Sequence, residues 1–364
     1  MSAARSSALR RGGWGLALGW ALACAAPALA QDGSTGTDTS LAPRAAMEAP
    51  RADQALLLDV AQAGGGWLAV GEHGLILRST DGAHWQQVPS PVDVTLVRLR
   101  FLDAQRGWAL GYDGCVLATE DGGAHWRILQ YDAAWGRPWF DVRFFDPDHG
   151  LLAGTNGTLK ITSDGGKTWQ AIDSPAFADT PNLYNLIALG DGSLLIAGER
   201  GLLARSTDRG LSWTQLKSPY TGSYFGALAV GARGALVFGL RGNAFYAPDL
   251  AQAPALSAQE RAALEEAANN PEYAARKIDP VSAVAGWIEL KSDQTESLFG
   301  GTIAPDGRVL LFGMNGHVMQ AELGAARLQP LAVSTDNNLN AGAVAGDHLL
   351  VVGSAGVQRL PLPR

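Results

Sequence analysis

The chain has little cysteine and no excess of basic residues. Of its 364 residues only Cys24 and Cys115 are cysteines, and Cys24 lies in an N-terminal segment that we expect to be removed. One remaining cysteine cannot form an internal disulfide, so a stable core must come from packing. Acidic residues outnumber basic ones and give a formal net charge of −7. This charge argues against a nucleic-acid partner, because such partners are bound through Lys and Arg.

The common motifs of catalysis and metal binding are also missing. The sequence contains no His-Glu-x-x-His, no Walker loop, no Gly-x-Ser-x-Gly and no Cys-x-x-Cys. Its six histidines are scattered over turn positions rather than grouped at the spacing of ligands. We therefore expect a protein that is not an enzyme and that carries no metal and no cofactor.

Long apolar runs are absent outside the N-terminus, where the pattern is that of a secretory signal. Three arginines precede the apolar stretch from Gly12 to Ala26, which is too short for a membrane span. Ala28-Leu29-Ala30 supplies small residues for cleavage after Ala30, which predicts a periplasmic or secreted protein that does not span the membrane. Cleavage removes three arginines and no acid, so the formal charge becomes −10.

Two other export routes stay open at this point. The pair Arg10-Arg11 is compatible with twin-arginine export, and Cys24 is compatible with a lipoprotein anchor. Residues 31–55 are rich in Gly, Ser, Thr, Asp, Pro and Ala, which predicts a flexible linker.

The most regular feature of the chain is a repeated Gly-x-x-Gly. Successive copies begin 40, 43, 44, 41, 74 and 40 residues apart, and the long interval indicates one period plus an insertion. A period of about 40 residues with four short strands is typical of a β-propeller blade. We therefore predict an all-β, seven-bladed β-propeller of four-stranded antiparallel blades over residues 56–364. The copies are Gly71–Gly74, Gly111–Gly114, Gly154–Gly157, Gly198–Gly201, Gly239–Gly242, Gly313–Gly316 and Gly353–Gly356.

The repeat leaves two irregularities. Residues 249–279 form an insertion in blade five, and Ser257-Ala-Gln-Glu260 is a capping box that predicts a helix over 261–268 and a further turn over 272–277. This insertion is either a docking element or a solvated excursion beside the ring. Blade seven has only three strands before Arg364, so we predict that a stretch within residues 41–52 supplies the closing strand.

A second motif recurs in blades one to four, between the third and fourth strands. The copies, of the form Ser/Thr-x-Asp-Gly-Gly-x-x-Trp with small deviations, are residues 79–85, 119–126, 162–169 and 206–213. The Asp carboxylate can accept backbone N–H bonds, Gly permits the reversal, and Trp packs inward. The motif resembles the Asp-box, or BNR repeat.

Together the two motifs resemble those of the photosystem II stability/assembly factor family and its bacterial relatives, over residues 56–216. This resemblance implies a non-catalytic exported propeller that helps to assemble or stabilise a membrane-protein complex by binding a protein partner. Sialidase-like Asp-box glycoside hydrolases are the alternative. For them, Arg100, Arg143, Arg200 and Arg241 would bind a carboxylate, and Tyr184 or Tyr224 would be the nucleophile.

Two candidate sites follow from the alignment. Counting seven residues back from the glycine after each innermost strand gives a polar rank that we expect to line a central channel: Asp59, Arg100, Arg143, Asn185 and, with a shift of one residue, Asn340. The alternative is a water-filled channel without a ligand.

The second site is the face that carries the Gly-x-x-Gly loops, where aromatic and charged residues favour a protein interface. Its candidates are Glu72, Tyr112, Asp113, Arg137, Tyr184, Glu199, Arg200, Tyr224, Arg241 and Asn315.

Overall fold

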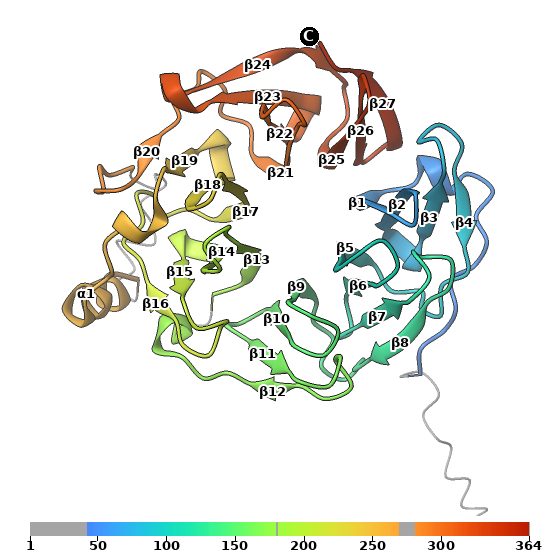
Figure 1. Cartoon of the computed structure of the whole chain (residues 1–364), viewed down its shortest axis with the longest axis horizontal. Helices are drawn as coiled ribbons and strands as arrows, with labels where there is room; N and C mark the ends of the chain where they lie inside the picture. Colours follow the sequence, from blue (N-terminus) through green and yellow to red (C-terminus); the bar gives the residue numbers. More distant parts are fainter. Residues whose placement is uncertain (1–41, 180, 269–280, 364) are drawn as a thin grey trace, which may run out of the picture. The chain divides into compact units, whose positions relative to one another are not determined.

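The computed structural model describes residues 42–179, 181–268 and 281–363. The predicted signal segment and the second helical turn of the insertion therefore lie outside the described residues. Within residues 40–364, seven antiparallel sheets are arranged in a ring, and the first strand of each sheet is the innermost (Figure 1). The predicted seven-bladed β-propeller is confirmed. No helix among the described residues is long and apolar enough to cross a membrane.

Six blades have four strands each. The first three are β1 Leu57–Ala63, β2 Gly66–Gly71, β3 Ile76–Ser79 and β4 Gln86–Val88; β5 Leu96–Phe101, β6 Gly107–Gly111, β7 Val116–Thr119 and β8 Arg127–Gln130; β9 Trp139–Phe144, β10 Gly150–Gly154, β11 Leu159–Thr162 and β12 Gln170–Ala171. The next three are β13 Leu183–Ala188, β14 Leu194–Gly198, β15 Leu203–Ser206 and β16 Thr214–Gln215; β17 Tyr224–Val230, β18 Gly234–Gly239, β19 Ala244–Ala247 and β20 Ile288–Glu289; β21 Leu298–Ile303, β22 Val309–Gly313, β23 His317–Glu322 and β24 Arg327–Ser334.

Blade seven has three strands, β25 Leu339–Ala345, β26 His348–Gly353 and β27 Gly356–Pro361. Short 3-10 turns occupy Ala52–Gln54 (η2), Glu72–Gly74 (η3), Pro175–Phe177 (η4), Glu199–Gly201 (η5), Leu240–Gly242 (η6), Leu250–Gln252 (η7), Met314–Gly316 (η8) and Leu323–Ala325 (η9).

The core consists of apolar layers between neighbouring blades. Leu68 of blade one and Leu117 of blade two belong to one buried cluster, and Leu57 and Leu350 join blade one to blade seven in another. Cys115 is fully buried in the first of these clusters, and its burial raises the pKa of its thiol to about 12. Cys115 therefore serves as a small apolar side chain of the core.

The ring closes without the predicted extra strand. The described part of that stretch, residues 42–52, forms no strand. Instead, Ala46 N donates to Ser90 O at the outer edge of blade one, and η2 packs against β27. Pro43 and Pro50 lack the N–H that a ladder needs, so this stretch is a poor fourth strand. Closure rests on packing of β1 against β25 and on a bond from Asn340 Nδ2 to Leu57 O at 2.9 Å.

The insertion of blade five lies between β19 and β20. Its helix α1, Ala258–Ala268, has the predicted capping box, in which Glu260 N donates to Ser257 Oγ and Ser257 N donates to Glu260 Oε2. Lys217 Nζ lies 2.6 Å from Glu260 Oε1, and this ion pair links the helix to the segment after β16. The helix α1 lies on the outer side of the ring (Figure 1).

The Asp-boxes have the hydrogen bonds that their sequence predicts. In blade three, Gly166 N donates to Thr162 Oγ1, while Thr168 donates from its backbone N and its Oγ1 to the Asp164 carboxylate. These bonds to Thr168 lower the pKa of Asp164 from 3.8 to about 2. In blade two, burial alone would raise the pKa of Asp121, but hydrogen bonds from His125 lower it, also to about 2.

We expect these carboxylates to make stability depend on pH in acid. Their folded pKa lies below the unfolded value, so their contribution is complete above about pH 4 and is lost as the pH falls towards 2. The thermal midpoint measured between pH 5 and pH 2 should fall steeply, and Asp164→Asn should flatten part of that fall. A wild-type midpoint that does not change over this interval would contradict the prediction.

Candidate functional site

The Gly-x-x-Gly loops define one face of the ring, because each connects the second and third strands of a blade. In six of the seven copies the third residue adopts a positive φ, between 53° and 58°, and the following glycine adopts one as well. In blade one, Leu75 N donates to Glu72 O across the two positive-φ residues, which is the pattern of a tight hairpin turn. We call this side the Gly-x-x-Gly face. The Asp-boxes and the hairpins after the innermost strands lie on the opposite side, the Asp-box face.

The predicted residues of the Gly-x-x-Gly face divide into three groups. Tyr112, Arg137, Arg200, Arg241 and Asn315 are exposed, as expected. Glu72, Asp113 and Glu199 are half-buried, and two of them have bracing roles: Glu72 Oε1 accepts from Leu56 N, and Glu199 Oε2 accepts from Asn182 N. Tyr184 is also half-buried, but it belongs to the axis of the ring, which is described below.

The prediction that Tyr224 lies on this surface is wrong. Tyr224 is fully buried at the start of β17, edge-on to Tyr220 and Phe245, and its hydroxyl hydrogen-bonds with Ser218 Oγ at 2.8 Å. Burial raises the pKa of its phenol. The aromatic ring fills the layer between blades, so it cannot contact a partner or serve as the nucleophile of the sialidase alternative.

The innermost strands bring charged residues together at the axis. We call Asp59, Arg98, Arg100, Asp141 and Arg143, from blades one to three, the axial cluster. Arg100 forms a bidentate pair with the fully buried Asp141, with Nε–Oδ1 at 2.8 Å and Nη2–Oδ2 at 2.9 Å, and lies 3.8 Å from Asp59. Burial opposes the charge of Arg100, but the two carboxylates outweigh it and raise the pKa of Arg100. This pairing fixes the guanidinium at the axis.

Both carboxylates also connect neighbouring blades. Asp59 of blade one accepts from Leu99 N of blade two at 2.9 Å, and Asp141 of blade three accepts from Leu186 N of blade four at 2.8 Å. Asn185 stands at the equivalent position of blade four, but its buried Oδ1 has no partner among the described residues. A buried acceptor without a donor is costly, which marks this point of the axis as unsatisfied.

Arg143 differs from the other two arginines of the axial cluster. Arg98 donates to Phe140 O and Tyr184 O at 3.2 and 3.4 Å and lies 3.9 Å from Asp59. Within the described chain Arg143 has no ion pair or hydrogen bond, and its burial together with the charge of Arg100 lowers its pKa. The axial cluster thus has three guanidinium groups for two carboxylates.

Four aromatic residues follow one another around the axis, one from each of blades three to six. Phe140 and Tyr184 have ring centroids 4.9 Å apart, Tyr184 and Phe225 are 5.7 Å apart, and Phe225 and Phe299 are 5.7 Å apart. All four are half-buried, and we call them the aromatic arc. Each stands at a register shift near the start of its strand, where the pairing with the second strand skips one residue. The bulge turns these side chains towards the axis.

The structure brings only part of the predicted polar rank together. Asp59, Arg100 and Arg143 meet at the axis, whereas Asn340 bonds to the backbone of blade one. Arg98, Asp141 and the aromatic arc were missed, because positions were counted back from the glycine that follows each innermost strand. The distance of this glycine from the start of the strand varies between blades. The first glycine of Gly-x-x-Gly is the better reference: each residue of the arc lies 14 positions before it.

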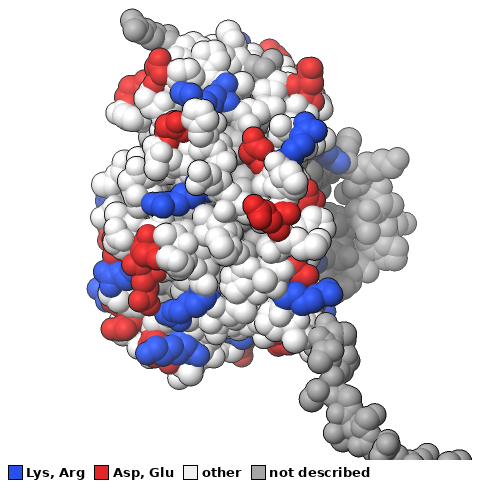
Figure 2. Space-filling view, turned by 90° about the vertical axis from the view of Figure 1, so that its right-hand side faces the viewer, with Lys and Arg blue, Asp and Glu red and all other residues white. Residues whose placement is uncertain are grey.

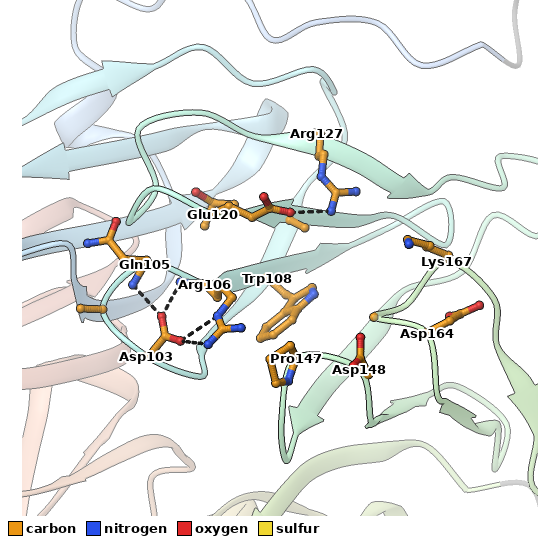
Figure 3. Close-up of a pocket in the computed structure, with 14 residues that line it drawn as sticks. Asp103, Gln105, Arg106, Trp108, Glu120, Arg127, Pro147, Asp148, Asp164 and Lys167 are labelled. Atoms are coloured by element: carbon orange, nitrogen blue, oxygen red, sulfur yellow. Dashed lines mark hydrogen bonds and ion pairs between the residues drawn. The ribbon is translucent and has the colours of Figure 1, made fainter.

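The Asp-box face has a separate cavity of about 680 Å³ between blades two and three (Figure 3). Trp108 lines it and stacks on Phe144 with centroids 3.8 Å apart. Both arginines of its lining are paired: Arg106 lies 2.7 Å from Asp103, and Arg127 lies 3.0 Å from Glu120. The side of the ring that Figure 2 shows likewise has acidic and basic side chains interspersed, without an extended region of one sign. Neither region offers the excess positive charge of the axis.

Comparisons with known proteins agree with this architecture. The family described as photosynthesis system II assembly factor YCF48 matches residues 135–260, which span blades three and four and most of the described strands of blade five. The photosystem II assembly protein Ycf48 of Thermosynechococcus vestitus (strain NIES-2133 / IAM M-273 / BP-1) is 29% identical over 61 residues. That alignment spans 17% of this chain and only 18% of the relative.

Solved structures of the same name share the fold over nearly the whole ring. The structure of YCF48 bound to D1 peptide has a TM-score of 0.61 at 15% identity and covers 88% of this chain and 97% of its own. YCF48 from Cyanidioschyzon merolae has a TM-score of 0.61 at 14% identity. The match covers 87% of this chain and 98% of the YCF48 chain. The expected resemblance to the assembly-factor family is confirmed, although the family match begins later in the chain than the motifs suggested.

Proposed function

We propose that this Ycf48-like propeller is an exported accessory factor that binds a membrane-associated protein partner through its Gly-x-x-Gly face. Export is inferred from the N-terminal pattern of residues 1–30, with cleavage after Ala30. Protein binding is supported by the structural relative YCF48, which was solved with a bound D1 peptide.

The observation that carries the proposal is the exposure of large apolar side chains in the Gly-x-x-Gly loops. Tyr112 is 46% exposed in blade two and Met314 is 37% exposed in blade six. Both stand at the second position of the Gly-x-x-Gly motif, which is the first residue of the tight turn, where a polar residue would serve the turn equally well. Arg200 and Arg241 are exposed on the same face. Apolar, aromatic and arginine side chains on one face are the composition of a protein interface.

Partner retrieval should depend on this face. We expect the double variant Tyr112→Ser/Met314→Ser to retrieve at least tenfold less of the partner from solubilised native membranes than the wild type does, at an unchanged thermal midpoint. The matched control is Leu211→Ser/Ile303→Ser, since both residues are exposed apolar side chains on the Asp-box face. Equal retrieval by the two double variants would contradict the proposed interface.

A further inference from the structure

The sheet of blade seven ends at its third strand. Within residues 42–363, β27 pairs with β26 and with no further strand, whereas the third strand of each other blade also pairs with a fourth. The turn η2 packs only against the start of β27, where a Cβ on Gly356 would meet the backbone oxygen of Asp53. No described strand therefore lies in the fourth position of blade seven, at the circumference of the ring (Figure 1).

The pairing of β27 decides which of its backbone groups point outward. Leu362 N, one residue past the strand, donates to Asp347 O at 2.9 Å, in the same register as the ladder between β26 and β27. Hydrogen-bonded pairs alternate in an antiparallel ladder, so the even-numbered residues of β27 bond to β26. The N–H and C=O groups of Val357 and Arg359 point away from β26, and none of the described residues bonds to them.

Blades one and four show what kind of strand fits this position. Their third strands and β27 share the pattern apolar-x-Arg, in residues 76–78, 203–205 and 357–359. In blade one, the fourth strand runs antiparallel and places Val88 opposite Ile76 and Gln86 opposite Arg78. Blade four has the same arrangement of an apolar and a polar residue. By this internal comparison, a strand beside β27 would place an apolar residue opposite Val357 and a polar residue opposite its arginine.

Both faces of such a strand would meet apolar side chains. Val357 and Trp85 are half-buried in the layer between blades seven and one. On the other face, Leu360 packs in the layer between blades six and seven, where Leu331 and Val333 of β24 are also half-buried. An added strand would cover apolar area that these side chains still expose, which favours its binding.

The charge of Arg359 and the shape of the edge select the occupant. The side chain of Arg359 is exposed and has no ion pair or hydrogen bond within the described chain. Opposite charges on directly opposed residues of an antiparallel pair attract, so an acidic residue fits best there. A second copy of β27 fits poorly, because Pro361 has no N–H and because β4 and β24 of the flanking blades extend one strand further out. A single extended segment meets neither obstacle.

We propose that β27 binds an extended segment of another protein as the fourth strand of blade seven. The segment has the pattern Asp/Glu-x-Leu/Val/Ile and runs antiparallel to β27, with its acidic residue opposite Arg359 and its apolar residue opposite Val357. Its backbone bonds to the outward N–H and C=O groups of these two residues, which is recognition by strand addition. The inference goes beyond the proposed function, because this edge lies at the circumference of the ring and not on the Gly-x-x-Gly face.

Fluorescence anisotropy of labelled hexapeptides, titrated with the full processed chain, tests the pairing. The probe acetyl-Ser-Trp-Glu-Gln-Leu-Lys-amide copies residues 212–217 around the fourth strand of blade four, with Glu in place of its Thr and the label on Lys. We expect saturable binding. N-methylation of Glu and Leu, whose N–H groups face β27, should weaken binding at least tenfold. N-methylation of Trp and Gln, whose N–H groups face away, should change the affinity by less than about twofold.

Two substitutions of one residue separate the backbone from the charge. Arg359→Pro removes an outward N–H together with the charge, and it should bind the probe at least tenfold more weakly. Pro361 stands two residues further on the same edge, so this position of β27 tolerates proline and the variant should fold. Arg359→Gln keeps the N–H and should lose only the preference for the probe over a version with Lys in place of Glu.

The double variant Tyr112→Ser/Met314→Ser should bind the probe as the wild type does, which keeps failure of this edge distinct from failure of the partner interface. The proposal is overturned by equal effects of the two N-methylated isomers, by wild-type affinity in Arg359→Pro, or by the absence of saturable binding at millimolar concentration. Sedimentation supplies one further test: a dimer of the wild type that Arg359→Pro dissociates would assign the edge to a second copy and would also overturn the proposal.

Discussion

Replacing Asp141 with alanine should lower the free energy of unfolding by about 3–5 kcal/mol, the range for breaking one partner of a buried ion pair. Asp141 is fully buried and holds Arg100 through two bonds of 2.8 and 2.9 Å. Its loss leaves the guanidinium of Arg100 with one nearby carboxylate, that of Asp59, which is 3.8 Å away. It also removes the acceptor of Leu186 N, which joins blade three to blade four. Urea unfolding of the two proteins measures the difference.

The double variant Asp141→Ala/Arg100→Met separates the charge from the bridge between blades. Removing both charges should recover part of the loss, because the unpaired guanidinium is gone while the backbone N–H of Leu186 remains without its acceptor. A loss below about 1 kcal/mol in the single variant, or a double variant no more stable than the single, would show that the axial ion pair does not hold these blades together.

The second large effect is expected at the second glycine of the repeat. Gly201 has a φ of +74°, and a Cβ there would lie 2.3 Å from Tyr220 O, in the segment that enters the next blade. Gly201→Ala therefore combines the cost of positive φ, about 1–2 kcal/mol, with a backbone clash that only movement of blade five can relieve. We expect a total loss of at least about 3 kcal/mol in the free energy of unfolding.

Gly192→Ala is the matched control in the same blade. Gly192 has a φ of +83°, but nothing lies within 4 Å of a Cβ built there. We expect Gly192→Ala to lower the free energy of unfolding only by the cost of positive φ, about 1–2 kcal/mol. Equal losses in the two variants would mean that contact with the next blade contributes nothing at Gly201.

These glycines also explain why the architecture could be predicted from the sequence. The second glycine of the repeat packs on the segment entering the next blade at Gly74, Gly201 and Gly316, so geometry restricts the position to glycine at a fixed period. Gly356 packs in the same way on Asp53, and this contact takes the place of the predicted closing strand. The strand pairing predicted there is wrong, because Pro43 and Pro50 lack the N–H groups that a ladder needs.

The axial site was harder to predict because it depends on a bulge. A single skipped residue at the start of each innermost strand shifts which side chain faces the axis, and hairpins of different length hide this shift. Tyr224 shows the same problem: it starts an innermost strand just before the bulge and is buried, while the next residue, Phe225, joins the aromatic arc. Alternation alone does not show which residue of such a pair faces the axis.

The central claim, that a protein partner binds the Gly-x-x-Gly face, is tested most directly by site-specific photo-crosslinking in native membranes. Tyr112→p-benzoylphenylalanine places the probe on that face, and Leu211→p-benzoylphenylalanine places it on the Asp-box face, where Leu211 is 68% exposed. We predict that the probe at position 112 forms a crosslink to one membrane-associated protein and that the probe at position 211 does not. Crosslinking of that protein from position 211 alone, or equally from both positions, would contradict the account.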